Sequence, residues 1–279
     1  MKNRWIYMHR MVMAVVAAAL LFVVTCPTHA RSSLSEAQMH DLFSQGKSLF
    51  KQANEKAATD PEAARDLYER AALRFERLAD EGGIENGKLY YNIGNAYFRM
   101  GDLGRAILNY RRAARYIPND PNLKQNLSFA RSRQADRIEE TQQAKVFKTL
   151  LFWHYDFSPN IRALVFAICY GLFWLAALIH LFVRRIPRWL FACTGVVGIL
   201  FFGSIVYETI HHVRHPGGVI LSEEVVARKG DGPTYQPSFK APLHEGTEFT
   251  VIEKRGGWYQ IELPDARRCW IPEESAALI

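Results

Sequence analysis

The feature that most constrains this chain is a regular spacing of aromatic and small residues between positions 90 and 118. Large side chains recur there at intervals of three and four, first over 90–97 and again over 106–113. Such intervals place side chains on one face of a helix, so the stretch predicts two helices. Small residues between the two helices let their backbones approach closely. A unit of only two helices cannot bury its apolar face alone, so it must stack on neighbours. The defining residues are Tyr90, Ile93, Gly94, Tyr97, Ala106, Tyr110, Ala113 and Pro118.

This spacing resembles the tetratricopeptide repeat (TPR), a helix–turn–helix unit of about 34 residues. The clearest copy covers residues 87–120. An irregular copy precedes it, because Gly46 stands 48 residues before Gly94 with similar helical spacing around it. The excess of about 14 residues over one repeat fits a longer turn and a longer second helix. The sequence therefore predicts an all-α TPR domain over residues 31–145.

The segment directly after the clear repeat is predicted to close the array. Lys124 and Arg131 take the places of the two tyrosines of the first helix. Charged residues at these positions suit a capping helix with a solvated outer face. The array is therefore predicted to be short. We expect this polar helix to continue to residue 143 as a connector.

The first thirty residues are typical of a secretory signal peptide. Residues 1–30 have a basic start, an apolar stretch and a small residue, Ala30, at the expected cleavage point. Two alternatives stay open, in which the leader is retained as an anchor or Cys26 is lipidated. All three place the following residues outside the cytoplasm.

Two further apolar runs predict a transmembrane hairpin. Residues 160–183 and 189–210 are each long enough to cross a bilayer, which needs about 20 helical residues. Residues 146–159 are aromatic-rich but too polar to span, so they predict a segment lying in the membrane interface. The turn between the spans is basic and is placed in the cytoplasm by the positive-inside rule. Its arginines are Arg184, Arg185 and Arg188.

The C-terminal part, residues 217–279, has the two-residue alternation of β-strands. Five short apolar runs are separated by glycine- and proline-containing turns, which predicts a small all-β barrel. The sequences GWY at 257–259 and WIP at 270–272 resemble those of a bacterial SH3-like domain. The fold class is therefore multidomain: an all-α TPR array, a two-helix transmembrane hairpin and an all-β SH3-like barrel.

Taken in this order, these parts resemble the Bat-type (aerotolerance operon) TPR membrane proteins, in particular their BatE-like branch. The residues that carry the resemblance are LYYNIGNAY at 89–97, PNDP at 118–121, NL at 126–127 and the FW and SP pairs within 152–159. The resemblance implies a non-enzymatic, multi-pass protein of the bacterial inner (cytoplasmic) membrane, with periplasmic TPR and SH3-like domains. It also implies partners among von Willebrand A-type membrane proteins, encoded near a MoxR-type ATPase.

The candidate site is the groove that the first helices of a TPR array line. Asn95 and Asn126 have the 31-residue separation of two groove asparagines that clamp a C-terminal carboxylate in some TPR proteins. Tyr91 stands where such clamps have a lysine, which favours a broader peptide-binding groove. We expect Asn95→Ala or Arg99→Glu to weaken partner co-purification without unfolding the array. The predicted groove residues are Lys88, Tyr91, Asn95, Phe98, Arg99 and Asn126.

Other potentially reactive side chains are interpreted as structural rather than as catalytic or metal-binding. His211 and His215 have a zinc-compatible helical spacing, but we interpret them, like His180, as interfacial polar residues. Cys269 is interpreted as a small core residue. The sequence has no G-x-S-x-G, H-E-x-x-H or P-loop pattern, so no catalytic residue, metal or cofactor is expected.

Two classes of function remain. The first is a membrane scaffold whose TPR groove and SH3-like domain recruit protein partners; the second is an envelope-anchoring protein whose SH3-like domain binds peptidoglycan. We interpret the net charge of +7 as membrane topology rather than nucleic-acid binding, because no base-reading motif accompanies it. The scaffold is the favoured prediction.

Overall fold

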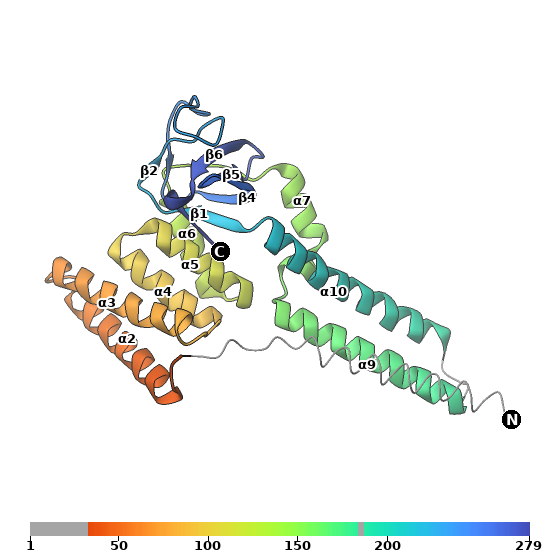
Figure 1. Ribbon diagram of the computed structural model, residues 1–279. Helices are drawn as coiled ribbons and strands as arrows, with labels where there is room; N and C mark the ends of the chain where they lie inside the picture. The colour runs from red at the N-terminus through yellow and green to blue at the C-terminus, as the bar shows by residue number, and fades with distance from the viewer. Residues whose placement is uncertain (1–32, 184–186) are drawn as a thin grey trace.

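The computed structural model describes residues 33–183 and 187–279. The predicted signal peptide with Cys26, and the turn residues Arg184 and Arg185, lie outside these ranges. The described chain forms a helical array, a pair of long apolar helices and a C-terminal strand-rich region (Figure 1).

Five helices build the array, and each begins where a polar side chain caps it. At every one of the five starts, a side-chain oxygen accepts a hydrogen bond from a free backbone N–H of the first turn. Ser35 and Gln38 form a reciprocal capping box at the first start. The helices are α2 (Glu36–Lys56), α3 (Pro61–Asp80), α4 (Gly87–Met100), α5 (Leu103–Tyr116) and α6 (Pro121–Ser132).

Close packing of α4 on α5 explains the spacing between positions 90 and 118. A Cβ atom at Gly94 would lie 2.6 Å from the Tyr110 ring and 3.2 Å from the Ala106 carbonyl oxygen, so only glycine allows this approach. Ile93, Ala106 and Tyr110 are buried in the contact, together with Ala113. Tyr90 is half-buried and stacks on Tyr116, and α5 ends at Tyr116, two residues before Pro118.

The prediction that a polar helix continues to residue 143 as a connector is wrong. Helix α6 ends at Ser132, and the next helix does not begin until Gln142. The intervening segment runs along the strand-rich region, where the Asp136 carboxylate accepts hydrogen bonds of 2.7 Å from the His244 backbone N–H and the Thr247 hydroxyl. These long-range contacts stabilise an extended path in place of a local helix.

The segment before the first long apolar helix is also helical. It consists of α7 (Gln142–Leu150) and the short α8 (Phe152–Tyr155), and the Ser158–Pro159 step separates both from that long helix. Several large apolar side chains on this segment are exposed, among them Phe147, Leu150 and Phe152.

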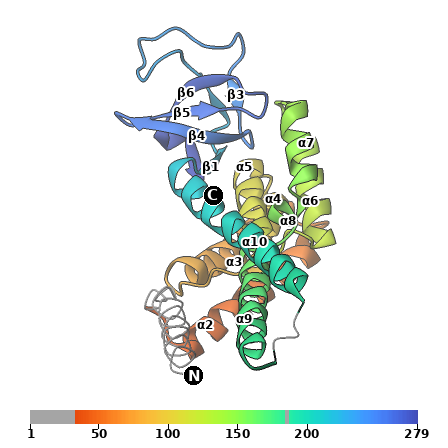
Figure 2. The same ribbon diagram turned by 90° about the vertical axis from the view of Figure 1, so that its right-hand side faces the viewer.

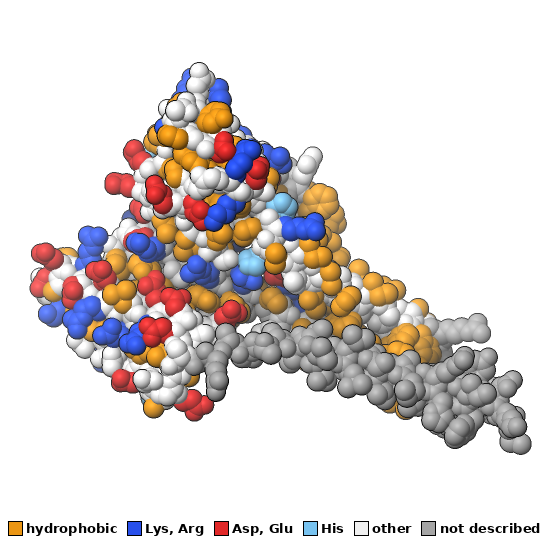
Figure 3. Space-filling model, in the orientation of Figure 1, with side chains coloured by type: hydrophobic (Ala, Val, Ile, Leu, Met, Phe, Trp, Pro, Cys, Tyr) orange, Lys and Arg blue, Asp and Glu red, His pale blue; other side chains and the backbone are white. Residues whose placement is uncertain are grey.

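Two helices are long and apolar enough to cross a membrane, judged by length and composition. They are α9 (Pro159–Val183) and α10 (Arg188–Arg214), so the second extends four residues beyond the predicted 189–210. Hydrophobic side chains cover much of this pair on the face seen in Figure 3, whereas charged groups gather over the array and the strand-rich region.

The strand-rich region is not a closed barrel. Five antiparallel strands form a sheet in the order β6-β5-β4-β1-β7, and β2 pairs with β3 in a separate two-stranded sheet. Two of these strands, β3 and β7, were not predicted, because two or three residues carry too little alternation to be recognised. The strands are β1 (Gly217–Ile220), β2 (Glu224–Val225), β3 (Leu243–His244), β4 (Glu248–Arg255), β5 (Trp258–Glu262), β6 (Arg268–Pro272) and β7 (Ala276–Leu278).

Helix α5, rather than another strand, meets the sheet at β1 and β7. A guanidinium N–H of Arg112 donates to the Leu278 carbonyl of β7 at 2.8 Å. A Cβ atom at Gly104 would lie 2.8 Å from the Ile220 carbonyl, so helix and strand touch backbone to backbone. Val219 of β1 is buried within the core of the helical array. Figures 1 and 2 both place the sheet against the α5–α6 end of the array, so the two regions share one core.

Candidate protein-binding groove

Four of the six predicted groove residues lie where α4 meets α6, and all four are partly buried: Tyr91, Asn95, Phe98 and Asn126. Lys88 and Arg99 are exposed on α4. Phe98 packs on Phe129 of α6 with ring centroids 5.6 Å apart. The Arg133 guanidinium lies 5.0 Å from the Phe129 centroid, and Phe129 remains 48% exposed. Phe129 therefore belongs to this surface, although the sequence interpretation did not include it.

Two asparagines predicted to face a ligand are bonded instead to neighbouring side chains. The Asn95 carbonyl oxygen accepts from the Tyr110 hydroxyl at 2.8 Å and from the Asn126 amide at 2.9 Å. The Asn126 amide also donates to the Tyr91 hydroxyl at 3.0 Å. Burial raises the pKa of Tyr110 above its ordinary value, so the phenol stays protonated and donates. We call these four residues the asparagine cluster; it joins α4, α5 and α6.

A second part of the same side, between α2 and α4, was missed by the sequence interpretation. It is a cavity of about 420 Å³. The signal that identifies it is the 48-residue offset of Gly46 from Gly94, because the same offset relates Phe43 to Tyr91 and Lys47 to Asn95. The lining residues are Phe43, Lys47, Phe50, Lys51, Asn54, Phe75 and Asn92.

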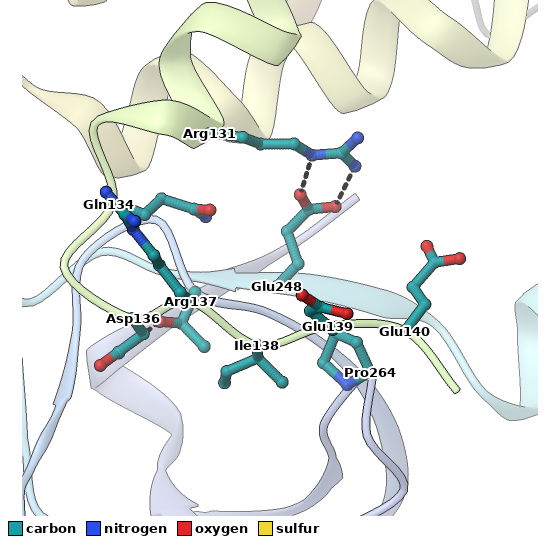
Figure 4. A pocket seen from close by; sticks show the side chains of 10 residues that line it. Arg131, Gln134, Asp136, Arg137, Ile138, Glu139, Glu140, Glu248 and Pro264 are labelled. Carbon is teal, nitrogen blue, oxygen red and sulfur yellow. Dashed lines mark hydrogen bonds and ion pairs between the residues drawn. The ribbon is translucent and has the colours of Figure 1, made fainter. Parts of the chain in front are cut away.

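The joint between the array and the sheet contains a smaller cavity of about 310 Å³ (Figure 4). In it the Glu248 carboxylate meets the Arg131 guanidinium at 2.6 and 3.0 Å, and Arg111 Nε of α5 lies 2.9 Å from the same carboxylate. Burial raises the pKa of Glu248, but the two arginines outweigh it and hold the pKa below its ordinary value. Arg131 is thus bound to Glu248 of the sheet while its side chain stays 41% exposed.

The apolar helix pair carries a buried charged group, Arg162. Arg162 of α9 is 2% exposed, forms an ion pair with Glu208 of α10 and donates to the Ser204 hydroxyl at 2.8 Å. His154 lies 3.0 Å from the same guanidinium. Glu208 falls inside the predicted second span, and the sequence interpretation overlooked it as an acidic partner. Pairing compensates for much of the cost of removing these charges from water.

The remaining candidate side chains show ordinary structural contacts. The rings of His211 and His215 are 5.6 Å apart, and His215 Nδ1 lies 3.2 Å from the Val251 carbonyl oxygen. Across residues 33–183 and 187–279, no group of three or more His, Cys, Asp or Glu side chains is arranged to hold a metal ion. Cys269 is buried in the core of the strand-rich region, and burial raises its thiol pKa to about 12.

The fold and groove define a helical-repeat protein whose array is joined to a strand-rich region and to two apolar helices. Comparison with known families agrees with the first part of that description: residues 87–120, which contain α4 and α5, match the tetratricopeptide repeat. No curated protein matches this chain. TPRs are non-catalytic repeats whose stacked helices form concave surfaces for binding other proteins. The repeat therefore indicates a scaffold for protein–protein interaction.

Proposed function

We propose that this protein is a non-enzymatic, membrane-anchored scaffold that recruits protein partners in the bacterial envelope. The observation that carries the proposal is a helical array that matches the tetratricopeptide repeat over residues 87–120 and is connected to two long apolar helices. The predicted groove residues Lys88 and Arg99 are exposed on α4 and available to a partner.

Two sets of contacts support a fixed position for the array. The Asn119 amide of the α5–α6 turn donates to the Asp156 carbonyl at 2.7 Å, just before α9 begins. On the other side, α10 leads directly into β1, which packs on α5. The start of α9 and the end of α10 are thus both connected to the array, which restricts how a bound partner is oriented.

Membrane anchoring rests on α9 and α10. Their length, their exposed apolar surface and the pairing of Arg162 with Glu208 all suit helices in a bilayer. In the proposed topology the basic turn that includes Arg188 is cytoplasmic, and the array and strand-rich region are periplasmic.

The partners we propose are von Willebrand A-type membrane proteins, and the protein itself would be of the Bat type. The basis is the resemblance in order of parts: leader, short TPR array, apolar hairpin and SH3-like region. The strand-rich region would then act as a second recruiting module beside the groove.

The scaffold proposal is tested by affinity purification of the full chain from solubilised membranes, with bound proteins identified by mass spectrometry. We expect Arg99→Glu to reduce the recovery of specific partners severalfold while the circular dichroism spectrum is unchanged. Arg65→Glu is the matched control, because Arg65 is an exposed arginine on α3 outside the predicted groove. Equal recovery with both variants would contradict a role for the groove.

The alternative, an SH3-like region that binds peptidoglycan, is favoured by one observation. A groove of about 820 Å³ crosses the strand-rich region and exposes apolar side chains, among them Val226 and Trp258. The full chain in detergent should then sediment with purified sacculi, and Trp258→Ala should abolish sedimentation. The intact chain is needed because Val219 lies in the helical core, so residues 217–279 alone would expose it.

A further inference from the structure

Three of the seven residues that line the cavity between α2 and α4 are phenylalanines. Phe75 of α3, which is 2% exposed, contributes to its lining, and its ring centroid lies 5.9 Å from that of Phe43. Phe43 is 39% exposed, and Phe50 adds another partly buried ring to the lining. Exposed apolar surface around a concave cavity is the usual setting for a docked side chain.

Two lysines of α2 border the same cavity. The Lys47 ammonium lies 5.6 Å from the centre of the Phe43 ring, and among the described residues no carboxylate lies within ion-pair distance of it. Lys51 meets Glu55 at 3.9 Å with both side chains exposed, a contact that contributes little. The cavity therefore combines an apolar interior with positive charge at its edge.

The equivalent positions in α4 are occupied differently. Tyr91 and Asn95, which correspond to Phe43 and Lys47, donate to or accept from neighbouring side chains in the asparagine cluster. Because those polar groups are already bonded within the protein, a ligand gains less by binding them. The α2 half of the concave side has the more available binding groups.

We propose that the cavity between α2 and α4 is the primary recognition pocket for the partner. Its ligand is a protein segment in which an aromatic or large aliphatic side chain stands beside aspartate or glutamate. The apolar side chain packs against the exposed side of the Phe43 and Phe75 rings, and the carboxylates lie against Lys47 and Lys51. This inference rests on the proposed protein-binding function and names the chemistry of the bound segment.

The test is a selection of random phage-displayed peptides on the full chain in lipid nanodiscs. We expect the enriched peptides to carry an aromatic or large aliphatic residue next to acidic residues, and to bind more weakly as salt is raised. Synthetic copies of an enriched peptide should lose about tenfold in affinity on Phe43→Ala, and about as much on Lys47→Glu. Failure to enrich this pattern would overturn the proposal.

Two control variants separate the pocket from general effects. Leu73→Ala removes a comparably exposed apolar side chain from α3, and Lys56→Glu reverses a lysine of α2 outside the cavity. Neither should change peptide affinity. Equal losses in the controls and the pocket variants would also overturn the proposal.

The proposed function can survive the failure of this inference. If partners still co-purify with the Phe43→Ala and Lys47→Glu proteins but are lost with Arg99→Glu, the groove binds proteins elsewhere along α4. The pocket proposal is then wrong and the scaffold proposal stands. If peptides bind the pocket but no membrane protein co-purifies with the intact chain, the scaffold proposal is the one that fails.

Discussion

The two halves of the array's predicted concave side, along α2 and along α4, carry different residues at equivalent positions of the repeat. Between α4 and α6, polar side chains bond one another, as the Asn95 carbonyl does with Tyr110 and Asn126. Between α2 and α4, the corresponding side chains are a half-exposed phenylalanine and a lysine with no carboxylate within ion-pair distance in the described chain. The first half uses its polar groups to join three helices, and the second leaves its groups for a ligand.

The comparison shows why residue type and repeat position do not by themselves identify a binding site. Asparagines at groove positions predicted recognition, yet their amides are engaged inside the protein. A polar side chain whose hydrogen bonds are satisfied internally contributes to stability, whereas an unpaired charge beside exposed apolar surface contributes to binding. The two halves should therefore respond oppositely to substitution.

The largest expected effect separates the interior of the α2–α4 cavity from its edge. Phe75→Ala removes a side chain that is 2% exposed and should lower the free energy of unfolding by about 3–5 kcal/mol. Phe43→Ala should cost far less, because Phe43 is already 39% exposed. Denaturant unfolding of both variants, followed by circular dichroism, measures the difference. Similar losses would mean that Phe43 is part of the core rather than of an open pocket.

The asparagine cluster gives the next largest effect. Asn95→Ala leaves the buried Tyr110 hydroxyl without its acceptor and should cost about 1–3 kcal/mol of stability. The expectation from sequence that Asn95→Ala does not unfold the array stays a prediction, and the same measurement tests it. Adding Tyr110→Phe to the Asn95→Ala protein should recover part of the loss, because the hydroxyl that had lost its acceptor is then absent. No recovery in denaturant unfolding would show that the hydrogen bond is unimportant.

A smaller, pH-dependent effect tests how firmly α6 is held in place. The folded-state pKa of Glu248 lies below 4.5, so its stabilisation is complete above pH 4.5 and is lost as pH falls through the folded value. Because Arg111 and Arg131 are each 41% exposed, we expect Glu248→Gln to cost only about 1 kcal/mol. Unfolding measured between neutral and acidic pH should show less acid sensitivity in the variant than in the parent.

The smallest effect on stability belongs to Lys47. Lys47→Ala should change the free energy of unfolding by less than about 0.5 kcal/mol, because the side chain is exposed and unpaired among the described residues. Its effect on peptide binding should nevertheless exceed that of Lys56→Ala. Parallel unfolding and peptide-titration measurements check both statements. A clear loss of stability with unchanged binding would reverse the assignment of the two halves.

Much of the local structure could be predicted from the sequence. The spacing around Gly94, the capping residues and the two apolar runs each depend on neighbours within a few turns of helix. The α2 half of the groove was recoverable too, since Gly46 repeats Gly94, but the irregular length of the first repeat obscured the equivalence of Phe43 and Tyr91. Glu208 was present in the sequence and became informative once its pairing with Arg162 was visible.

The extended segment after α6 could not be predicted in the same way. Asp136 is unremarkable in a polar stretch that favours a helix. Its partners His244 and Thr247 lie more than a hundred residues further along the chain. A local pattern has no information about contacts at that separation.

Residue order alone was enough to define the helices of the repeat, the small residues that let α4 approach α5, and the apolar length of α9 and α10. The complete fold was needed to show that the strand-rich region shares a core with the array, and which groove side chains are already bonded. The cause of this division is separation along the chain: Arg131 and Glu248 are 117 residues apart. Whether a polar group is satisfied depends on all the atoms that surround it after folding, and not on its neighbours in the chain.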